Sequence, residues 1–167
     1  LNGKRGFLKT SMQRGFWPKN GIFPTKEMAE RDFKMLSEFG MNTVYMHRAI
    51  GQPRIFEYAD ARGFFTYEAP GGYRVTANPD DSILGPDEQA LQWRREKLRR
   101  MVKRDRSFPS FILYYLKNEE KNNPNKHDLA DMKMVRDLDP SRTLLYNSGS
   151  STASEADYQN ESPDDPN

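Results

Sequence analysis

The feature that most constrains the fold is an alternation of strand-like and helix-like segments joined by very short turns. Helical stripes of apolar residues run up to Gly40 and Gly63, and a short run rich in branched and aromatic residues follows each glycine. Glycine commonly ends a helix in a left-handed conformation, and such runs are typical of buried strands. Strands that alternate with helices form a parallel α/β sheet, because a helix carries the chain back between parallel neighbours.

Five strands are expected, at residues 7–10, 41–46, 64–69, 111–116 and 143–146. Four helices are expected between them, at residues 25–39 with Thr25 as the cap, 53–62 beginning at Pro53, 87–106 and 128–138. Residues 70–86 are rich in Gly, Pro, Asn and Asp and indicate a long loop. We therefore expect one folded unit over residues 1–147, followed by a polar tail or loop over residues 148–167.

Composition narrows the class of function. No window approaches the ~18 apolar residues of a membrane span, so no membrane partner is expected. There is no cysteine, and His47 and His127 are far apart, so we expect no metal site. The basic run 94–106 keeps helical apolar spacing and predicts a solvated outer helix face rather than a nucleic-acid site. An open nucleotide-binding sheet would suit the length, but no phosphate-binding glycine motif is present.

Ligand sites of parallel sheets lie beyond the carboxyl ends of the strands. The predicted strand ends carry polar, ionisable and aromatic side chains, namely Gln13, Arg14 and Trp17, then His47 and Arg48, then Glu68, then Asn118, Glu119 and Glu120, then Tyr146 and Asn147. At the opposite edge the turns at Gly40-Met41 and Gly63-Phe64 are short and contain no ionisable group. The sequence therefore predicts that function resides at the carboxyl edge of the sheet.

The most informative strand end is the apolar run 111–116, which stops abruptly at Lys117-Asn118-Glu119. A carboxyl group placed where a buried strand surfaces can be partly desolvated, which raises its pKa and suits it to donating a proton. The amide of Asn118 offers both a donor and an acceptor to a polar ligand. From this pattern alone, Glu119 is either a catalytic acid or a solvated loop carboxylate.

Other candidates also have two interpretations. Glu68 can contact a ligand or form structural hydrogen bonds within the protein. His47 and Arg48 can bind a substrate carboxylate or hydroxyls, although such a pair is more often structural. Trp17 can stack on a sugar or base face, or it can hold its own loop in place.

Three segments, residues 53–68, 102–110 and 113–119, resemble in their order along the chain the catalytic domain of glycoside hydrolase family 2, the family of β-galactosidases, β-glucuronidases and β-mannosidases. Residues 53–68 are similar to the family's DPRFYELCDELGLYVIDE stretch, and residues 102–110 are similar to its VERDKNHPS stretch. Residues 113–119 are similar to the strand end W-S-L-G-N-E. The similarity runs in the right order through residues 1–147.

The resemblance implies a partial TIM (β/α)8 barrel, about its first five βα units with parallel strands, and a retaining β-glycosidase acting on a carbohydrate substrate. It implies that Glu119 is the general acid/base and that Asn118 binds the sugar 2-hydroxyl or positions the nucleophile. The family's nucleophile is a Glu at the end of the seventh strand, so we expect this part alone to be inactive. The chemistry needs no cofactor. The other expected substrate-binding residues are Arg14, Trp17, His47, Arg48, Glu68 and Tyr146.

The sequence departs from the family pattern at four single positions and in one triplet. Tyr114, Tyr115 and Lys117 stand where the family has Trp, Ser and Gly, and Tyr45 stands where an Arg is usual. Gln13 lies in the triplet that replaces the family's Asn-Arg-His. These changes leave open a second interpretation, a non-catalytic relative that binds carbohydrate without cleaving it.

Two further expectations concern contacts of the chain. Lys117 can pair with a substrate carboxylate or with Glu120. A five-stranded arc has two open edges and an apolar inner face, so the rest of the barrel or a second copy is expected to cover it. The compartment is not indicated by the residues, although the resemblance is compatible with secretion or a periplasmic location.

Overall fold

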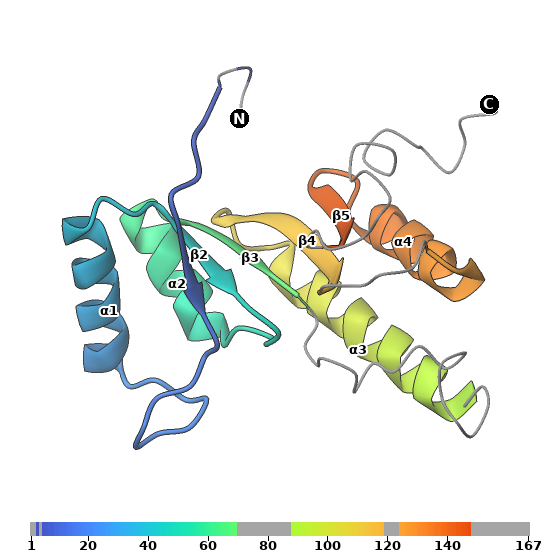
Figure 1. The fold of residues 1–167 in the computed structure, drawn as a ribbon, viewed down its shortest axis with the longest axis horizontal. Coiled ribbons are helices and arrows are strands. Elements are labelled where there is room, and N and C mark those ends of the chain that lie inside the picture. The colour runs from blue at the N-terminus through green and yellow to red at the C-terminus, as the bar shows by residue number, and fades with distance from the viewer. Residues whose placement is uncertain (1–2, 4, 70–87, 119–123, 148–167) are drawn as a thin grey trace.

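A computed structural model describes residues 3, 5–69, 88–118 and 124–147. Strands and helices alternate strictly, in the order β1 (Thr10–Gln13), α1 (Lys26–Glu38), β2 (Thr43–Met46), α2 (Pro53–Arg62), β3 (Phe65–Glu68), α3 (Glu88–Asp105), β4 (Phe111–Lys117), α4 (Lys126–Leu138) and β5 (Thr143–Asn147). The strands form one sheet in chain order with every neighbouring pair parallel (Figure 1). This arrangement confirms the predicted α/β class and corresponds to five units of a (β/α) barrel.

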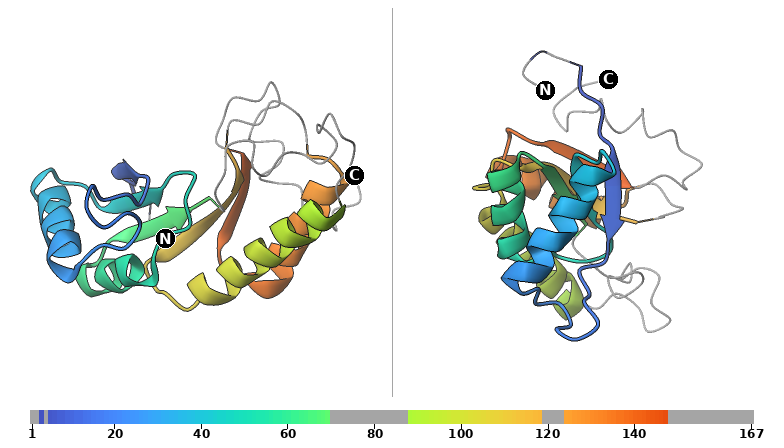
Figure 2. Two further views of the ribbon diagram at one scale, coloured as in Figure 1. Left: turned by 90° about the horizontal axis from the view of Figure 1, so that it is seen from below. Right: turned by 90° about the vertical axis from the view of Figure 1, so that its left-hand side faces the viewer.

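The helices lie together on one side of the sheet (Figure 2). This placement follows from the handedness of the crossover connections, which return each strand to its neighbour on the same side. The opposite face of the sheet is therefore the one that faces the interior in a closed barrel. The predicted loop 70–86 and the tail 148–167 lie outside the described residues.

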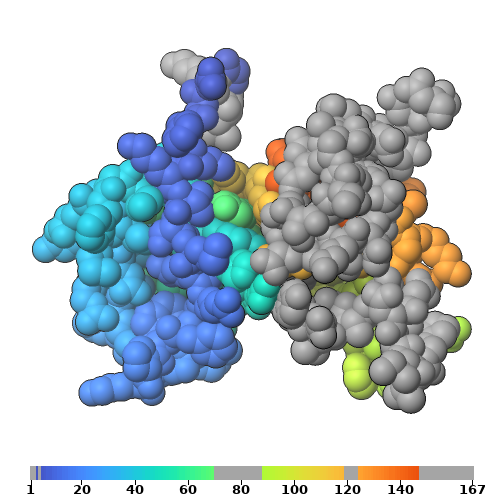
Figure 3. All heavy atoms as spheres, in the orientation of Figure 1, coloured from blue at the N-terminus to red at the C-terminus, as the bar shows by residue number. Residues whose placement is uncertain are grey.

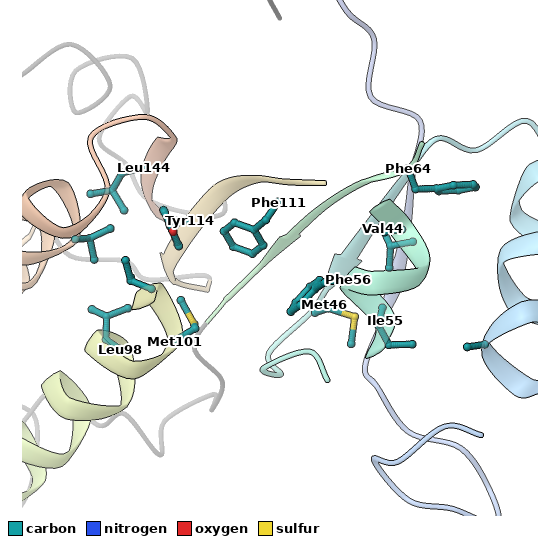
Figure 4. Packing of buried hydrophobic residues seen from close by; sticks show 14 of the residues in the cluster. Val44, Met46, Ile55, Phe56, Phe64, Leu98, Met101, Phe111, Tyr114 and Leu144 are labelled. Carbon is teal, nitrogen blue, oxygen red and sulfur yellow. The ribbon is translucent and has the colours of Figure 1, made fainter. Parts of the chain in front are cut away.

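The core lies between the strands and the helices and extends from β2 to β5 (Figure 4). Toward β2 it contains Val44, Met46 and Phe56, and toward β4 it contains Leu98 and Phe111, all of them buried. Burying a side chain of this size contributes about 1.5–3 kcal/mol to stability, so the sheet–helix interface supplies most of the driving force for folding.

The helix ends largely match the sequence signals. The Thr25 hydroxyl accepts a hydrogen bond from the Met28 backbone N–H at 3.3 Å, and Gly63 ends α2 with φ +70°. α4 begins two residues before the predicted start at residue 128, because Asn125 is its cap. The Asn125 side chain accepts from the Asp128 N–H, and the Asp128 carboxylate accepts from the Asn125 N–H, which forms a capping box.

The prediction for the first strand was wrong by three residues. β1 pairs with β2 from Thr10 opposite Thr43, whereas the predicted strand began at Phe7, which is exposed. The Asn42 side chain binds the segment before β1, since its Nδ2 donates to the Phe7 carbonyl and its Oδ1 accepts from the Lys9 N–H. The apolar pair Phe7-Leu8 suggested a strand, but the ladder begins only where the backbone faces β2.

β4 contains one extra residue relative to β3. Thr66 lies opposite Phe111, but Tyr67 lies opposite Leu113, so Ile112 is the additional residue in the ladder. This irregularity allows Phe111 and Tyr114, three positions apart, both to lie in the core between sheet and helices, with ring centroids 4.9 Å apart.

Candidate active site

The parallel order brings all five carboxyl strand ends to one edge of the sheet. Neighbouring ends are joined by backbone hydrogen bonds, from the His47 N–H to the Gln13 carbonyl at 2.7 Å and from the Ala69 N–H to the Met46 carbonyl at 3.4 Å. Asn118 follows directly after β4 and is half-buried. Glu119 and Glu120 lie outside the described residues, so the role of Glu119 stays a prediction.

Glu68 ends β3 with its carboxyl group fully buried on the helix side of the sheet. Its Oε2 accepts from the Gly51 N–H at 2.6 Å, and its Oε1 lies 3.5 Å from Nη2 of Arg104. Burial, followed by the charge and hydrogen bond of the neighbouring Asp105 carboxyl, raises the pKa of Glu68 well above its ordinary value. These contacts are the structural hydrogen-bonding role that the sequence left open.

Lys117 contacts a partner that the sequence did not suggest. Its Nζ lies 3.0 Å from Oδ2 of Asp128 at the start of α4, and the side chain is only 10% exposed. The Tyr146 hydroxyl donates to the same carboxylate oxygen at 3.2 Å, and the Lys117 ammonium lies 5.7 Å from the Tyr146 ring centroid. Asp128 is therefore one partner of Lys117, and the side chain of Tyr146 belongs to this buried contact.

The basic run of α3 is only partly a solvated face, which corrects the sequence prediction. Arg94 is 11% exposed and lies between two carboxylates of α4, with Nη2 2.8 Å from Oδ1 of Asp128 and 2.6 Å from Oδ2 of Asp131. Arg95 donates to the other oxygen of Asp131 at 2.9 Å. Burial, which lowers the pKa of Arg94, is outweighed by Asp131 and Asp128, so its pKa is raised. By contrast, Arg100 is 77% exposed.

Trp17 is part of the core, and its indole N–H donates to Oδ2 of Asp32 at 3.0 Å. Its backbone pairs with Gly21, which closes the loop after β1. These contacts hold the loop in place, which is one of the two roles that the sequence indicated for Trp17. Arg14 is exposed and, with Trp17 and Asp32, lines a surface cleft of about 320 Å³ between β1 and α1. Figure 3 shows β1 and the loop after it at the surface beside α1.

His47 and Arg48 follow β2 directly. His47 is buried, and its ring lies edge-on against Tyr45 with centroids 5.2 Å apart. Arg48 is partly exposed and has a left-handed backbone with φ 55°, which is uncommon for a residue other than glycine. The two residues therefore lie at the predicted edge.

Among the described residues, no group of three or more His, Cys, Asp or Glu side chains is arranged to hold a metal ion. No helix within residues 88–118, 124–147 or the other described ranges has the length and apolar character needed to cross a membrane.

The family model described as "Glycosyl hydrolases family 2, TIM barrel domain" matches residues 1–162. The chain belongs to this family. In family 2, similar curated proteins include the β-galactosidase of Lactococcus lactis, 27% identical over 89% of this chain, and β-galactosidase 2 of Enterobacter cloacae, 26% identical over 94%. This chain spans 15% of the length of each.

Solved structures confirm the fold of the family 2 chain. The β-glucuronidase of Ruminococcus gnavus matches with a TM-score of 0.72 at 21% identity, covering 86% of this chain and 25% of the other. The β-glucuronidase of Parabacteroides merdae matches with a TM-score of 0.68 at 19% identity, covering 86% and 18%. At these identities the likeness concerns the fold alone.

Two groups of side chains in this family 2 chain were not predicted from the sequence as parts of the site. Asp128 lies in the segment 125–128, whose N-x-x-D spacing is a capping-box signal that could have located it. Tyr45, Tyr67 and Tyr115 come together on the inner face, although the sequence treated two of them only as departures from the family pattern. The sequence pattern that could have located them is an aromatic residue near the end of each of three successive strands, β2, β3 and β4.

Proposed function

We propose that this chain is part of a retaining β-glycosidase that hydrolyses O-glycosidic bonds of a carbohydrate, with Glu119 as the general acid/base. The observation that carries the proposal is the position of Asn118. It follows β4 at the carboxyl edge of a parallel sheet that belongs to family 2, and the next residue in the chain is Glu119. That edge is where (β/α) barrels hold their reacting groups.

In this mechanism Glu119 protonates the leaving oxygen while a second carboxylate attacks the anomeric carbon, and then Glu119 deprotonates the incoming water. We expect the second carboxylate to come from outside this chain, because the resemblance places the nucleophile after a seventh strand and the structure describes five strands. The two carboxyl groups of a retaining pair lie about 5–5.5 Å apart. Asn118 binds the sugar 2-hydroxyl or holds that nucleophile. Relatives named β-galactosidase make β-linked galactosides the first substrates to test.

The test uses the full protein encoded by the complete gene, with β-glycosides that carry good and poor leaving groups. Glu119→Gln is expected to lower kcat by about 10²–10⁴-fold when the leaving group is poor, and by less when it is nitrophenolate, which needs little protonation. Glu120→Gln, the adjacent carboxyl, is the matched control and is expected to retain activity. Nuclear magnetic resonance of the first product is expected to show the β anomer.

Equal activity of Glu119→Gln and the parent protein on a poor leaving group would refute the assigned role. An α anomer as the first product would refute retention. Tight sugar binding by the parent protein without turnover of any glycoside would instead support the non-catalytic, carbohydrate-binding alternative. That alternative is based on the departures from the family pattern, such as Tyr45 and Lys117.

A further inference from the structure

One buried carboxylate connects three neighbouring elements to the start of α4. Asp128, in the first turn of α4, is 2% exposed. Its Oδ1 accepts a hydrogen bond from Nη2 of Arg94 on α3 at 2.8 Å. Its Oδ2 accepts from Nζ of Lys117 on β4 at 3.0 Å and from the Tyr146 hydroxyl on β5 at 3.2 Å. We refer to these four residues as the Asp128 cluster. Two of them come from α3 and α4, which lie side by side (Figure 2).

Lys117 is the member of the Asp128 cluster that belongs to β4. It is the last residue of that strand, and its side chain is 10% exposed. A lysine ammonium is rarely buried unless a carboxylate compensates its charge, so the pair with Asp128 fixes where this side chain lies. The family pattern has Gly at this position, and glycine has no side chain to make the contact. The contact is therefore a feature of this chain and not of the family pattern.

Backbone pairing supports the end of β4 more on one side than on the other. In the described ladders, β3 pairs with β4 as far as Tyr114, whereas β5 pairs with it as far as Lys117. Residues 115–117 thus extend beyond the described pairing with β3. A strand end with fewer backbone partners depends more on side-chain contacts for its position. The buried pair of Lys117 and Asp128 supplies such a contact at the last residue of the strand.

We propose that Asp128 is a positioning residue for the reaction assigned to this chain. Through Lys117 it fixes the carboxyl end of β4, and so the place where Asn118 leaves the strand. Asn118 follows Lys117 directly, and the proposed acid/base Glu119 is the next residue in the chain. Reacting groups need to be held within about 0.5 Å, and a displacement of ~1 Å can lower a rate about 100-fold. This inference rests on the proposed function and names a further residue on which the same reaction depends.

The test uses Lys117→Met in the full protein, because methionine keeps the length of the side chain and removes the ammonium. Asp128 retains Arg94 and Tyr146 as partners, so this variant is expected to fold. We expect Lys117→Met to lower kcat/KM about 10- to 100-fold for a methyl β-glycoside, whose leaving group needs a well-placed acid. For the nitrophenyl β-glycoside of the same sugar, the loss is expected to be less than about 3-fold. Lys117→Arg keeps the cation and is expected to retain most of the parent activity.

The ratio of these two losses separates positioning from stability. A smaller folded fraction would lower kcat/KM equally for both substrates, whereas a displaced acid lowers it mainly for the methyl glycoside. The double variant Lys117→Met/Asp128→Asn tests whether Asp128 acts through Lys117. It is expected to show the same ratio as Lys117→Met alone, because the contact is already absent. A further change in the ratio would overturn the proposed route.

Lys133→Met is the matched control. Nζ of Lys133 lies 3.0 Å from Oδ1 of Asp137 on the same helix as Asp128, but the two side chains are 64% and 62% exposed. An exposed ion pair contributes little, so Lys133→Met is expected to keep the parent kcat/KM for both glycosides. Parent-like values for Lys117→Met, or equal losses on the two substrates, would overturn the positioning role and leave the glycosidase proposal intact.

If the parent protein turns over no β-glycoside, the glycosidase proposal fails, and the catalytic role of Asp128 fails with it. Amide hydrogen exchange then tests the structural half of the inference. Roughly 10-fold faster exchange at residues 111–118 in Lys117→Met, but not in Lys133→Met, would show that the pair anchors the end of β4. Equal exchange in the two variants would refute the anchor as well.

Discussion

Replacing Arg94 by Met is expected to destabilise the contact between α3 and α4 strongly. The guanidinium is 11% exposed and donates to two carboxylates that are 2% and 4% exposed. Removing one partner of a buried ion pair typically costs about 3–5 kcal/mol, because the remaining charge stays desolvated. The carboxylates keep Lys117 and Arg95 as partners, so we expect a loss near the lower end, about 3 kcal/mol.

Amide hydrogen exchange of the full protein, followed by mass spectrometry on peptides from α3 and α4, measures this loss locally. A loss of this size corresponds to roughly 100-fold faster exchange in both helices. Arg100→Met is the matched control on the same helix, since Arg100 is 77% exposed and its ion pair with Glu96 lies at the surface. Equal exchange rates in the two variants would refute the claim that burial makes the Arg94 contact strong.

Three further predictions follow from single contacts. Burial raises the pKa of Glu68 above the ordinary value near 4.5, so between these two pKa values the folded state holds a proton that the unfolded state has released. The contribution of Glu68 to stability is therefore fully present below about pH 4.5 and is lost, by up to about 1.4 kcal/mol per pH unit, as pH rises through the folded pKa. Thermal unfolding of Glu68→Gln is expected to lack this slope. Gly51→Ala is expected to cost about 1–3 kcal/mol in urea unfolding, because its Cβ would lie 2.6 Å from the Phe56 ring; an unchanged midpoint would contradict this. Asn125→Ala is expected to cost about 1 kcal/mol by the same assay and Asn125→Asp much less, since aspartate also caps helices.

The element order was predictable because each turn carries a strong local signal. Gly63 ends α2 in the left-handed conformation, and Pro53 begins it, as the sequence indicated. The error at β1 arose because strand pairing depends on the neighbouring strand as well as on local composition. Phe7 and Leu8 look strand-like by themselves, yet β2 has no residue in the ladder opposite them.

The site was predictable as an edge of the sheet but not in its contacts. Glu68 and Tyr67 are adjacent at the end of β3, and only the direction of each side chain decides which of them faces the barrel interior. A strand that is apolar on both faces gives no alternation from which to read that direction. The pairing of Lys117 with Asp128 joins residues 11 positions apart on different elements, so no local pattern could predict it.

The extra residue in β4 divides that strand into two parts with opposite phase. Before Ile112 an odd-numbered position such as Phe111 faces the helices, whereas after it the odd-numbered Tyr115 faces the interior. Removing one residue here would rotate everything downstream to the other side, placing Tyr115 in the core and withdrawing it from Tyr45 and Tyr67. A single extra residue thus decides which side chains in the second part of β4 face the barrel interior. When relatives are aligned, a gap at this point would change the chemistry facing the ligand more than most substitutions would.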